Sequence, residues 1–356
     1  MRLKSVLFIL PFTFLLVLSC KKEKPEETVA FNKGTMLKNV SSNIILPALN
    51  DFDEALSDLQ VSLTTFSDDR TNQHLDEVKN NWRSAYLIWQ TVKIFDFGPI
   101  RNNGFKGATG TYPTDTAEVD ENIQNGTYNL ASASNVDAIG LSALDYLLYQ
   151  ADALSKFQND ENYVNYTTDL VEKLKNESTT VLNQWQSYQS TFDSSTGTSS
   201  TSAFSELVNE FNRDYELAKT AKVGIPLGKK SLEIQMPEYI EARYSGISFE
   251  LLNESVNALK HFFQGNSYES NNTGIGFDDY LVHLEKESLK NTINTNFDGI
   301  ISKINGFSNT FEEEMQQNTA ELDELYLLLQ EQVVYIKTDM TSAFGVLITY
   351  QDNDGD

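Results

Sequence analysis

The chain has 356 residues, with 51 Asp and Glu against 27 Lys and Arg, and a formal net charge of −24. A surface this acidic repels nucleic acid and anionic lipid headgroups, so we expect no nucleic-acid partner. Cys20 is the only cysteine, which excludes an intrachain disulfide and a cysteine-based zinc site.

The N-terminus has the layout of a secretory signal. Two basic residues precede an apolar run from Val6 to Leu18, which is too short to span a membrane. The run closes on VLSC, which resembles the lipobox of bacterial lipoproteins, where the chain is cut before the cysteine and acylated. We therefore predict a signal peptide at 1–19, lipidation of Cys20 and a charged tether at 20–28. This anchors the protein in the bacterial cell envelope, at the periplasmic or outer-membrane surface; the alternative is an ordinary signal peptide with an unrelated cysteine.

Apolar residues recur at helical spacing through most of the remaining chain. Four apolar stripes predict amphipathic helices over residues 44–63, 75–92, 163–188 and 322–347. Pro47 starts or kinks the first, and Gly98 and Pro99 end the second. The sequence contains no alternating strand pattern of any length. The predicted fold class is therefore all-α.

Two stretches lack this period. Residues 99–134 contain prolines and several glycines and predict a long loop, either a lid over a site or a loosely ordered segment. Residues 191–203 are rich in Ser and Thr and predict a linker. This linker would join an N-terminal helical-bundle half at 29–190 to a C-terminal half at 204–350, followed by an acidic tail at 351–356.

A faint internal match connects the two predicted halves. ALDYLLYQ at 143–150 can be laid over ALKHFFQG at 258–265. A duplication would make two helical bundles related by pseudo-symmetry, with a ligand-binding cleft between them. The alternative is that eight partly matching residues arose by chance.

Several segments, in order along nearly the whole chain after the signal, resemble the imelysin family. NNWRSAYLIWQTVKIFDFGP resembles its tryptophan-rich helix ending in Phe-Gly-Pro, and AIGLSALDYLLYQ lies where the family has Gly-x-His-x-x-Glu. EARYSGISFELLNESVNALKHFFQG resembles its second-half helix pair, and the ending GVLITYQDNDGD is also similar. The resemblance implies a two-domain, all-helical, secreted or lipid-anchored bacterial protein, often linked to iron supply. Some relatives are described as metallopeptidases and others as components of ferrous-iron uptake.

The chain departs from the family at its metal-binding positions. Ser142 replaces the histidine of the motif, Asp145 replaces its glutamate, and Lys93 replaces a glutamate often found before Phe-Gly-Pro. Residues at i and i+3 share a helix face, so His-x-x-Glu can hold one cation, whereas a serine hydroxyl is a poor metal ligand and no general base near neutral pH. An inward Lys93 would pair with Asp145 in the vacated site. The plainer alternative has Ser142 packed inside a helix and Asp145 either facing solvent or paired with a nearby base.

We predict no catalytic residues and a ligand site lined by Ser142, Asp145, Lys93, Arg83, Glu241, Arg243 and Ser245. The leading hypothesis is a non-catalytic binding module for a small ligand, a peptide or a partner protein of an iron-acquisition system. One alternative is a metallopeptidase in which Asp145 and Glu241 hold iron, calcium or zinc through oxygen ligands. Another is a surface structural or adhesion protein. For Glu241, Arg243, Ser245 and the nearby Ser248 the competing interpretation is helix capping.

Overall fold

The structure is a computed structural model that describes residues 30–270 and 272–350. The predicted signal peptide, the lipidation site Cys20, the tether and the acidic tail lie outside the described residues. Within them the chain folds into helices without a β-strand, and a single β-bridge joins Asn266 to Thr273. The all-α prediction is confirmed. None of the described helices combines the length and apolar character that crossing a membrane requires.

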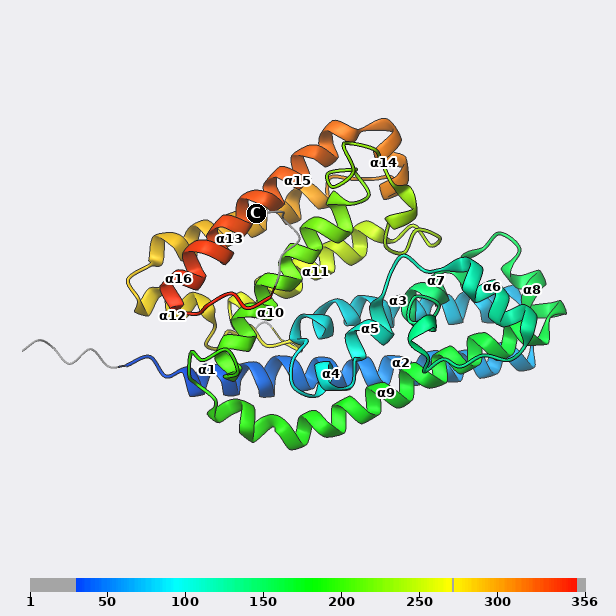
Figure 1. The fold of residues 1–356 in the computed structure, drawn as a ribbon, viewed down its shortest axis with the longest axis horizontal. Coiled ribbons are helices and arrows are strands. Elements are labelled where there is room, and N and C mark those ends of the chain that lie inside the picture. The colour runs from blue at the N-terminus through cyan, green and yellow to red at the C-terminus, as the bar shows by residue number, and fades with distance from the viewer. Residues whose placement is uncertain (1–29, 271, 351–356) are drawn as a thin grey trace, which may run out of the picture. The chain divides into compact units, whose positions relative to one another are not determined.

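The first part of the described chain is built around three long helices. Its elements are α1 (Lys33–Val40), η1 (Ser41–Ile45), α2 (Leu46–Asp68), α3 (Asn72–Val92), η2 (Lys93–Phe95), α4 (Pro99–Asn102), α5 (Phe105–Gly110), α6 (Thr116–Asn125), η3 (Ala133–Asn135), α7 (Gly140–Tyr149), α8 (Ala153–Asn159) and α9 (Glu161–Ser194). Helices α2, α3 and α9 pack along one another (Figure 1). Their contacting faces are the predicted apolar stripes, with Phe52, Trp82, Trp89 and Trp185 buried. The first three predicted helices are confirmed.

The second part contains the remaining helices. They are α10 (Ala203–Leu217), η4 (Ala218–Gly224), η5 (Pro237–Tyr239), α11 (Ser248–Phe263), α12 (Phe277–His283), α13 (Glu287–Ile304), α14 (Phe311–Gln317), α15 (Thr319–Val333), η6 (Val334–Met340) and α16 (Thr341–Phe344). Helix α13 packs against α11 and α15. The stripe predicted over 322–347 is confirmed as far as Phe344. Leu347 is 80% exposed, because the helix ends at Gly345 with a left-handed φ of 65°.

Helix α11 connects the two parts of the chain. It packs against α13 and also against α3, and the described residues from Asn32 onward form one compact unit. The start of the predicted linker at 191–203 belongs to α9, which ends at Ser194, and α10 begins at Ala203. The division into two bundle halves and their pseudo-symmetry stay predictions.

The prediction of a long loop at 99–134 is wrong. This segment contains α4, α5 and α6, and α5 packs against both α7 and α9. Phe105 anchors α5 in the core, and the side chain of Asp115 caps α6 by accepting hydrogen bonds from two backbone N–H groups. These helices have 4, 6 and 10 residues, too few turns for an apolar period to stand out in the sequence.

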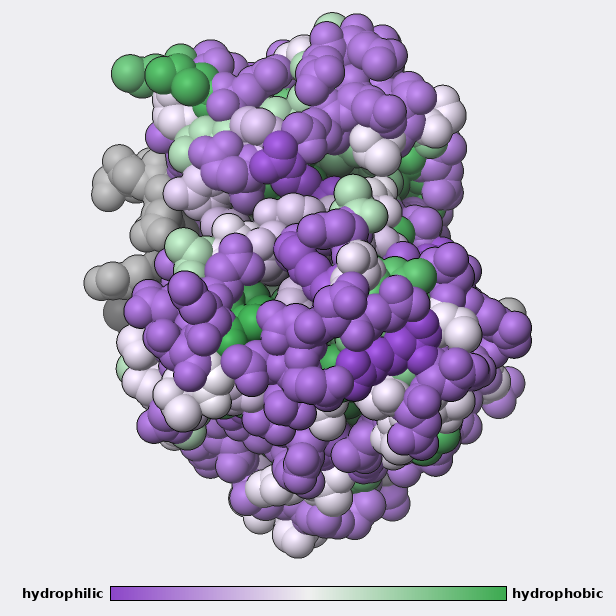
Figure 2. All heavy atoms as spheres, turned by 90° about the vertical axis from the view of Figure 1, so that its right-hand side faces the viewer, coloured by the Kyte–Doolittle hydropathy of each residue, from purple (hydrophilic) through white to green (hydrophobic). Residues whose placement is uncertain are grey.

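One face of the molecule is shown in Figure 2, where hydrophilic side chains predominate and hydrophobic ones are scattered. Scattered apolar side chains are ordinary on a protein surface. The features that position a site therefore lie inside the fold, where α3, α5, α7, α10 and α11 meet.

Candidate functional site

Helix α7 begins in close contact with α5 and is almost completely buried. Gly140 has a φ of +82°, and a Cβ added there would lie 2.5 Å from the carbonyl oxygen of Thr109, so glycine is required for this approach. Trp82 of α3 fixes the next turn by donating a 2.9 Å hydrogen bond from Nε1 to the carbonyl of Leu141. Asp145 is only 2% exposed. The interpretation in which it faces solvent is therefore wrong.

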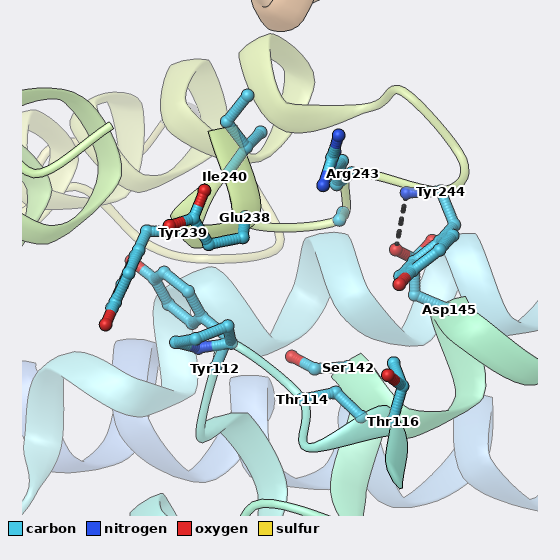
Figure 3. Close-up of a pocket in the computed structure, with 12 residues that line it drawn as sticks. Tyr112, Thr114, Thr116, Ser142, Asp145, Glu238, Tyr239, Ile240, Arg243 and Tyr244 are labelled. Carbon is cyan, nitrogen blue, oxygen red and sulfur yellow. Dashed lines mark hydrogen bonds between the residues drawn. The ribbon is translucent and has the colours of Figure 1, made fainter. Parts of the chain in front are cut away.

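Two residues of α7, Ser142 and Asp145, line a first cavity of about 280 Å³ (Figure 3). Its walls come from α7, from the turn between α5 and α6, and from the segment before α11. The lining residues are Tyr112, Pro113, Thr114, Thr116, Ser142, Asp145, Glu238, Tyr239, Ile240, Ala242, Arg243 and Tyr244. Tyr112 and Tyr239 stand on one side of this cavity, with Asp145 and Tyr244 on the other (Figure 3).

Both carboxylate oxygens of Asp145 accept hydrogen bonds from the facing segment. The backbone N–H of Tyr244 donates to Oδ2 and that of Ser245 to Oδ1, each at 3.0 Å (Figure 3 shows the first). Burial raises the pKa of Asp145 to about 6, against the lowering effect of the hydrogen bonds from Ser245 and Tyr244, and the nearby charge of Glu241 adds to the rise. Asp145 therefore ties α7 to the segment before α11.

The predicted ion pair between Lys93 and Asp145 is wrong. Lys93 does point inward, but its Nζ donates to Oδ2 of Asp214 at 2.6 Å and to Oγ of Ser255 at 3.1 Å. Asp214 lies on α10 and Ser255 on α11, so the lysine joins the end of α3 to both helices. Sequence reasoning missed Asp214 because it lies 121 residues further along the chain, and no motif marks it.

Glu241 connects the first cavity to a second one. Its Oε1 accepts a 3.1 Å hydrogen bond from the Tyr86 hydroxyl, and its Oε2 accepts one from Nζ of Lys222. The Tyr86 hydroxyl also shares a 3.2 Å hydrogen bond with Oγ of Ser142, so Ser142 reaches Glu241 through Tyr86. Lys222 lies on the π-helical turn η4, a rare conformation that is frequent at functional sites. Neither Tyr86 nor Lys222 was expected from the sequence, although a lysine near the predicted acids is a signal of charge pairing.

The second cavity has a volume of about 200 Å³. Its lining residues are Trp89, Lys93, Lys106, Gly110, Tyr112, Asp214, Leu217, Ala221, Lys222 and Glu241. Tyr112 lines both cavities, so they are neighbours. Lys106 donates a 3.2 Å hydrogen bond to Oδ1 of Asp214 and shares that carboxylate with Lys93. Burial raises the pKa of Asp214, but the charges of Lys93 and Lys106 outweigh it and bring the pKa down to about 2.

The predicted site residues fall in three places: Ser142, Asp145 and Arg243 line the first cavity, Lys93 and Glu241 line the second, and Arg83 and Ser245 line neither. Arg83 makes an ion pair with Glu250 at the surface. Arg243 forms two 2.8 Å hydrogen bonds to the Glu312 carboxylate. Capping was the alternative interpretation for the segment that contains Glu241. Oγ of Ser248, the first residue of α11, donates a 2.5 Å hydrogen bond to the backbone oxygen of Glu241.

The side chains present do not fit the metal site that the resemblance implies. Within residues 30–270 and 272–350, no three His, Cys, Asp or Glu side chains come together in a way that could hold a metal ion. Asp145 accepts two backbone N–H groups, and Glu241 accepts Tyr86 and Lys222. A lysine beside Glu241 also places positive charge where a cation would have to bind.

Comparisons with known proteins support a common fold and origin. A family model described as Imelysin matches residues 45–338. Iron-regulated protein A of Synechococcus elongatus is 22% identical over 227 residues, which cover 61% of this chain and 60% of that protein's own length.

Two solved structures resemble this one over most of their length. An imelysin-like protein from Psychrobacter arcticum has a TM-score of 0.73 at 17% identity, covering 90% of this chain and 97% of the other. A protein from Parabacteroides distasonis, named provisionally as an iron-regulated protein A precursor, has a TM-score of 0.72 at 14% identity and the same coverage, 90% and 97%. At these identities the likeness establishes the fold.

Proposed function

The chain belongs to the imelysin family, and on that basis we propose that it is a non-catalytic binding module of the bacterial cell envelope. The name of its relative, Iron-regulated protein A, supports a role in iron acquisition. The apolar run that ends in VLSC supports a lipid anchor on Cys20, with the folded part at the periplasmic or outer-membrane surface.

The observation that carries the proposal is that Asp145, at the family's motif, and Glu241 are both engaged by other groups of the same chain. A metal-dependent hydrolase needs carboxylate or imidazole donors free to bind the ion, and a base to activate water. Here Ser142 offers only a hydroxyl, and Asp145 is held by two backbone N–H groups. Glu241 is held by Tyr86 and by Lys222. Because these groups are already engaged, they favour binding a ligand over catalysing its hydrolysis.

The first cavity is the site we propose for that ligand. Its volume of about 280 Å³ is close to the lower end of known ligand pockets, which begin at about 300 Å³, so a small molecule fits better than a folded partner. Tyr112, Thr114 and Thr116 line it, together with Arg243. Hydroxyls donate and accept hydrogen bonds, which suits a polar ligand.

A cleavage assay tests the proposal. The full chain, purified in detergent, is incubated with an unfolded polypeptide in the presence and absence of a chelator. We expect the polypeptide to stay intact in both. Cleavage that the chelator abolishes would show a metallopeptidase and overturn the proposal.

Native mass spectrometry provides the second measurement. The protein is incubated with iron, zinc or calcium, desalted and weighed. We expect no stoichiometric retention, because Asp145 and Glu241 already have partners within the chain. Stoichiometric metal that is lost in the Asp145→Ala variant would instead favour the oxygen-liganded metallopeptidase.

A further inference from the structure

The second cavity carries an excess of positive charge. Among its lining residues, the three lysines Lys93, Lys106 and Lys222 face only two carboxylates, those of Asp214 and Glu241. The whole chain has a formal net charge of −24, so this small region reverses the sign of the rest. A local reversal of this kind selects for a negatively charged ligand.

Burial makes the unbalanced charge costly. Lys93, Lys222, Asp214 and Glu241 are all buried, and the Lys106 side chain is 19% exposed. An ionised group inside a protein is tolerated when it is paired. Lys93 and Lys106 share the carboxylate of Asp214, and Glu210, the next carboxylate near Lys106, already pairs with Arg101 and Arg213. Burial lowers the pKa of Lys93 to about 8, although Asp214 opposes the shift, and the charges of Lys222 and Lys106 lower it further. The lining residues of the second cavity therefore carry one more positive than negative charge.

Hydrogen-bond donors in the cavity also exceed their acceptors. An ammonium group carries three N–H donors. In the described part of the chain, Lys93 uses two of them, whereas Lys106 and Lys222 use one each. The hydroxyl of Tyr112 makes no hydrogen bond to any described residue and belongs to the same cavity. A ligand with anionic oxygens would satisfy these donors.

The walls between the lysines are apolar. Trp89, Leu217 and Ala221 line the cavity beside the ring of Tyr112. Leu217 is partly exposed and stands where the cavity meets the surface. Inorganic phosphate would leave these walls without a partner, whereas an organic acid would bury its carbon atoms against them.

We propose that the second cavity binds a small organic monocarboxylate, whose single charge balances the extra lysine and whose carbon part packs between Trp89, Tyr112 and Leu217. The inference rests on the proposed function, because it names a ligand class for the non-catalytic module. The ligand carboxylate accepts hydrogen bonds from Lys106 and Lys222, since these two have the most unused donors.

Calorimetric titration of the full-length chain tests the ligand class. The probes are benzoate, its neutral isostere benzamide, and inorganic phosphate. We expect benzoate to bind at least about tenfold more tightly than benzamide, the factor expected for one charge-assisted hydrogen bond, and more tightly than phosphate. No binding of benzoate, equal binding of benzamide, or tighter binding of phosphate would each overturn the inference.

Two lysine variants test the site. Lys106 and Lys175 are 19% and 18% exposed, and each pairs with an aspartate, Asp214 or Asp53, but only Lys106 lines the cavity. Lys106→Met should weaken benzoate binding at least about tenfold, and Lys175→Met should leave it within about twofold. Without ligand, Lys106→Met should melt no lower than the wild type, because it removes the unbalanced charge. A lower melting temperature with unchanged affinity would mean that Lys106 is only a structural ion-pair partner, and would refute the proposal.

A third variant blocks the cavity without changing a charge. Ala221→Leu should also weaken benzoate binding at least about tenfold by filling the space beside Trp89. Unchanged affinity in this variant would place the bound benzoate elsewhere and refute the site.

Failure of this inference is distinguishable from failure of the proposed function. Chelator-sensitive cleavage of a polypeptide overturns the function, whereas absent benzoate binding overturns only this inference.

Discussion

The substitution Lys93→Met removes the closer of the two lysines that hold the buried carboxylate of Asp214. Asp214 is 0% exposed and accepts hydrogen bonds from Lys93 at 2.6 Å and from Lys106 at 3.2 Å. Removing one partner of a buried ion pair costs about 3–5 kcal/mol, because the remaining charge is left in a medium that solvates it poorly. Lys106 remains, so we expect the lower end, about 3 kcal/mol. Methionine keeps most of the volume of the lysine stem, so little of this loss comes from a cavity.

Equilibrium unfolding in urea at neutral pH measures this loss. Lys106→Met, assayed beside it, should not lower the free energy of unfolding, because the shorter contact between Lys93 and Asp214 survives. Adding Asp214→Asn to Lys93→Met should recover part of the loss, because an amide without a lysine is cheaper to bury than a carboxylate. The double-mutant cycle made of Lys93→Met, Asp214→Asn and their combination gives the coupling energy between Lys93 and Asp214.

Equal losses for the two lysine variants would refute this reasoning. So would a loss for Lys93→Met below about 1 kcal/mol, which is the range of a solvent-exposed ion pair. Either result would mean that Lys93 is solvated, and that the end of α3 does not place it between α10 and α11.

Three further predictions concern other parts of the molecule. The folded-state pKa of Asp145, about 6, lies above its ordinary value of 3.8, so the folded protein binds this proton more tightly than the unfolded chain does. The stability that this group contributes should therefore fall by up to about 3 kcal/mol as the pH rises from about 4 to about 6, and Asp145→Asn should flatten that slope in urea unfolding at several pH values. Gly140→Ala should destabilise the protein by at least about 2 kcal/mol, because its Cβ would lie 2.5 Å from the Thr109 carbonyl oxygen at a φ of +82°. Gly107→Ala, with nothing within 4 Å of its Cβ, is the matched control and should not destabilise; similar losses in both variants would contradict the packing of α7 on α5. Cys20→Ser should move the protein from the membrane fraction to the soluble fraction of bacterial cells and abolish its labelling with a radioactive fatty acid, and a variant that stays with the membrane would contradict the lipid anchor.

The local features of this protein follow from its sequence. Apolar residues at a spacing of three and four predict the long helices, because burying one face of a helix requires that pattern whatever the partner is. Helix α3 ends at Val92 and continues as the 3-10 turn η2 to Phe95. The helical run stops before Gly98, which has a φ of +51°, and Pro99 starts α4. Ser142 and Asp145, at the positions of the motif, are also visible in the sequence, and both residues line the first cavity.

Other features required the folded structure. The short helices within 99–134 have too few turns to show a period, yet their connecting turn supplies Tyr112 to both cavities. Lys106 and Lys222 belong to no sequence motif. They become candidate ligand-binding residues only because α5 and η4 place them in the lining of the same cavity. Nothing in the sequence near Lys93 distinguishes Asp145 from any other acid as its partner.

The sequence by itself determined where the long helices lie and that Ser142 and Asp145 stand at the motif positions. Only the tertiary structure decided that Lys93 meets Asp214, 121 residues away, and that Asp145 receives backbone N–H groups. The reason is physical. Helix formation depends on contacts within a few residues, whereas the partner of a buried charge is fixed by how distant helices pack and by the desolvation that each pairing must offset.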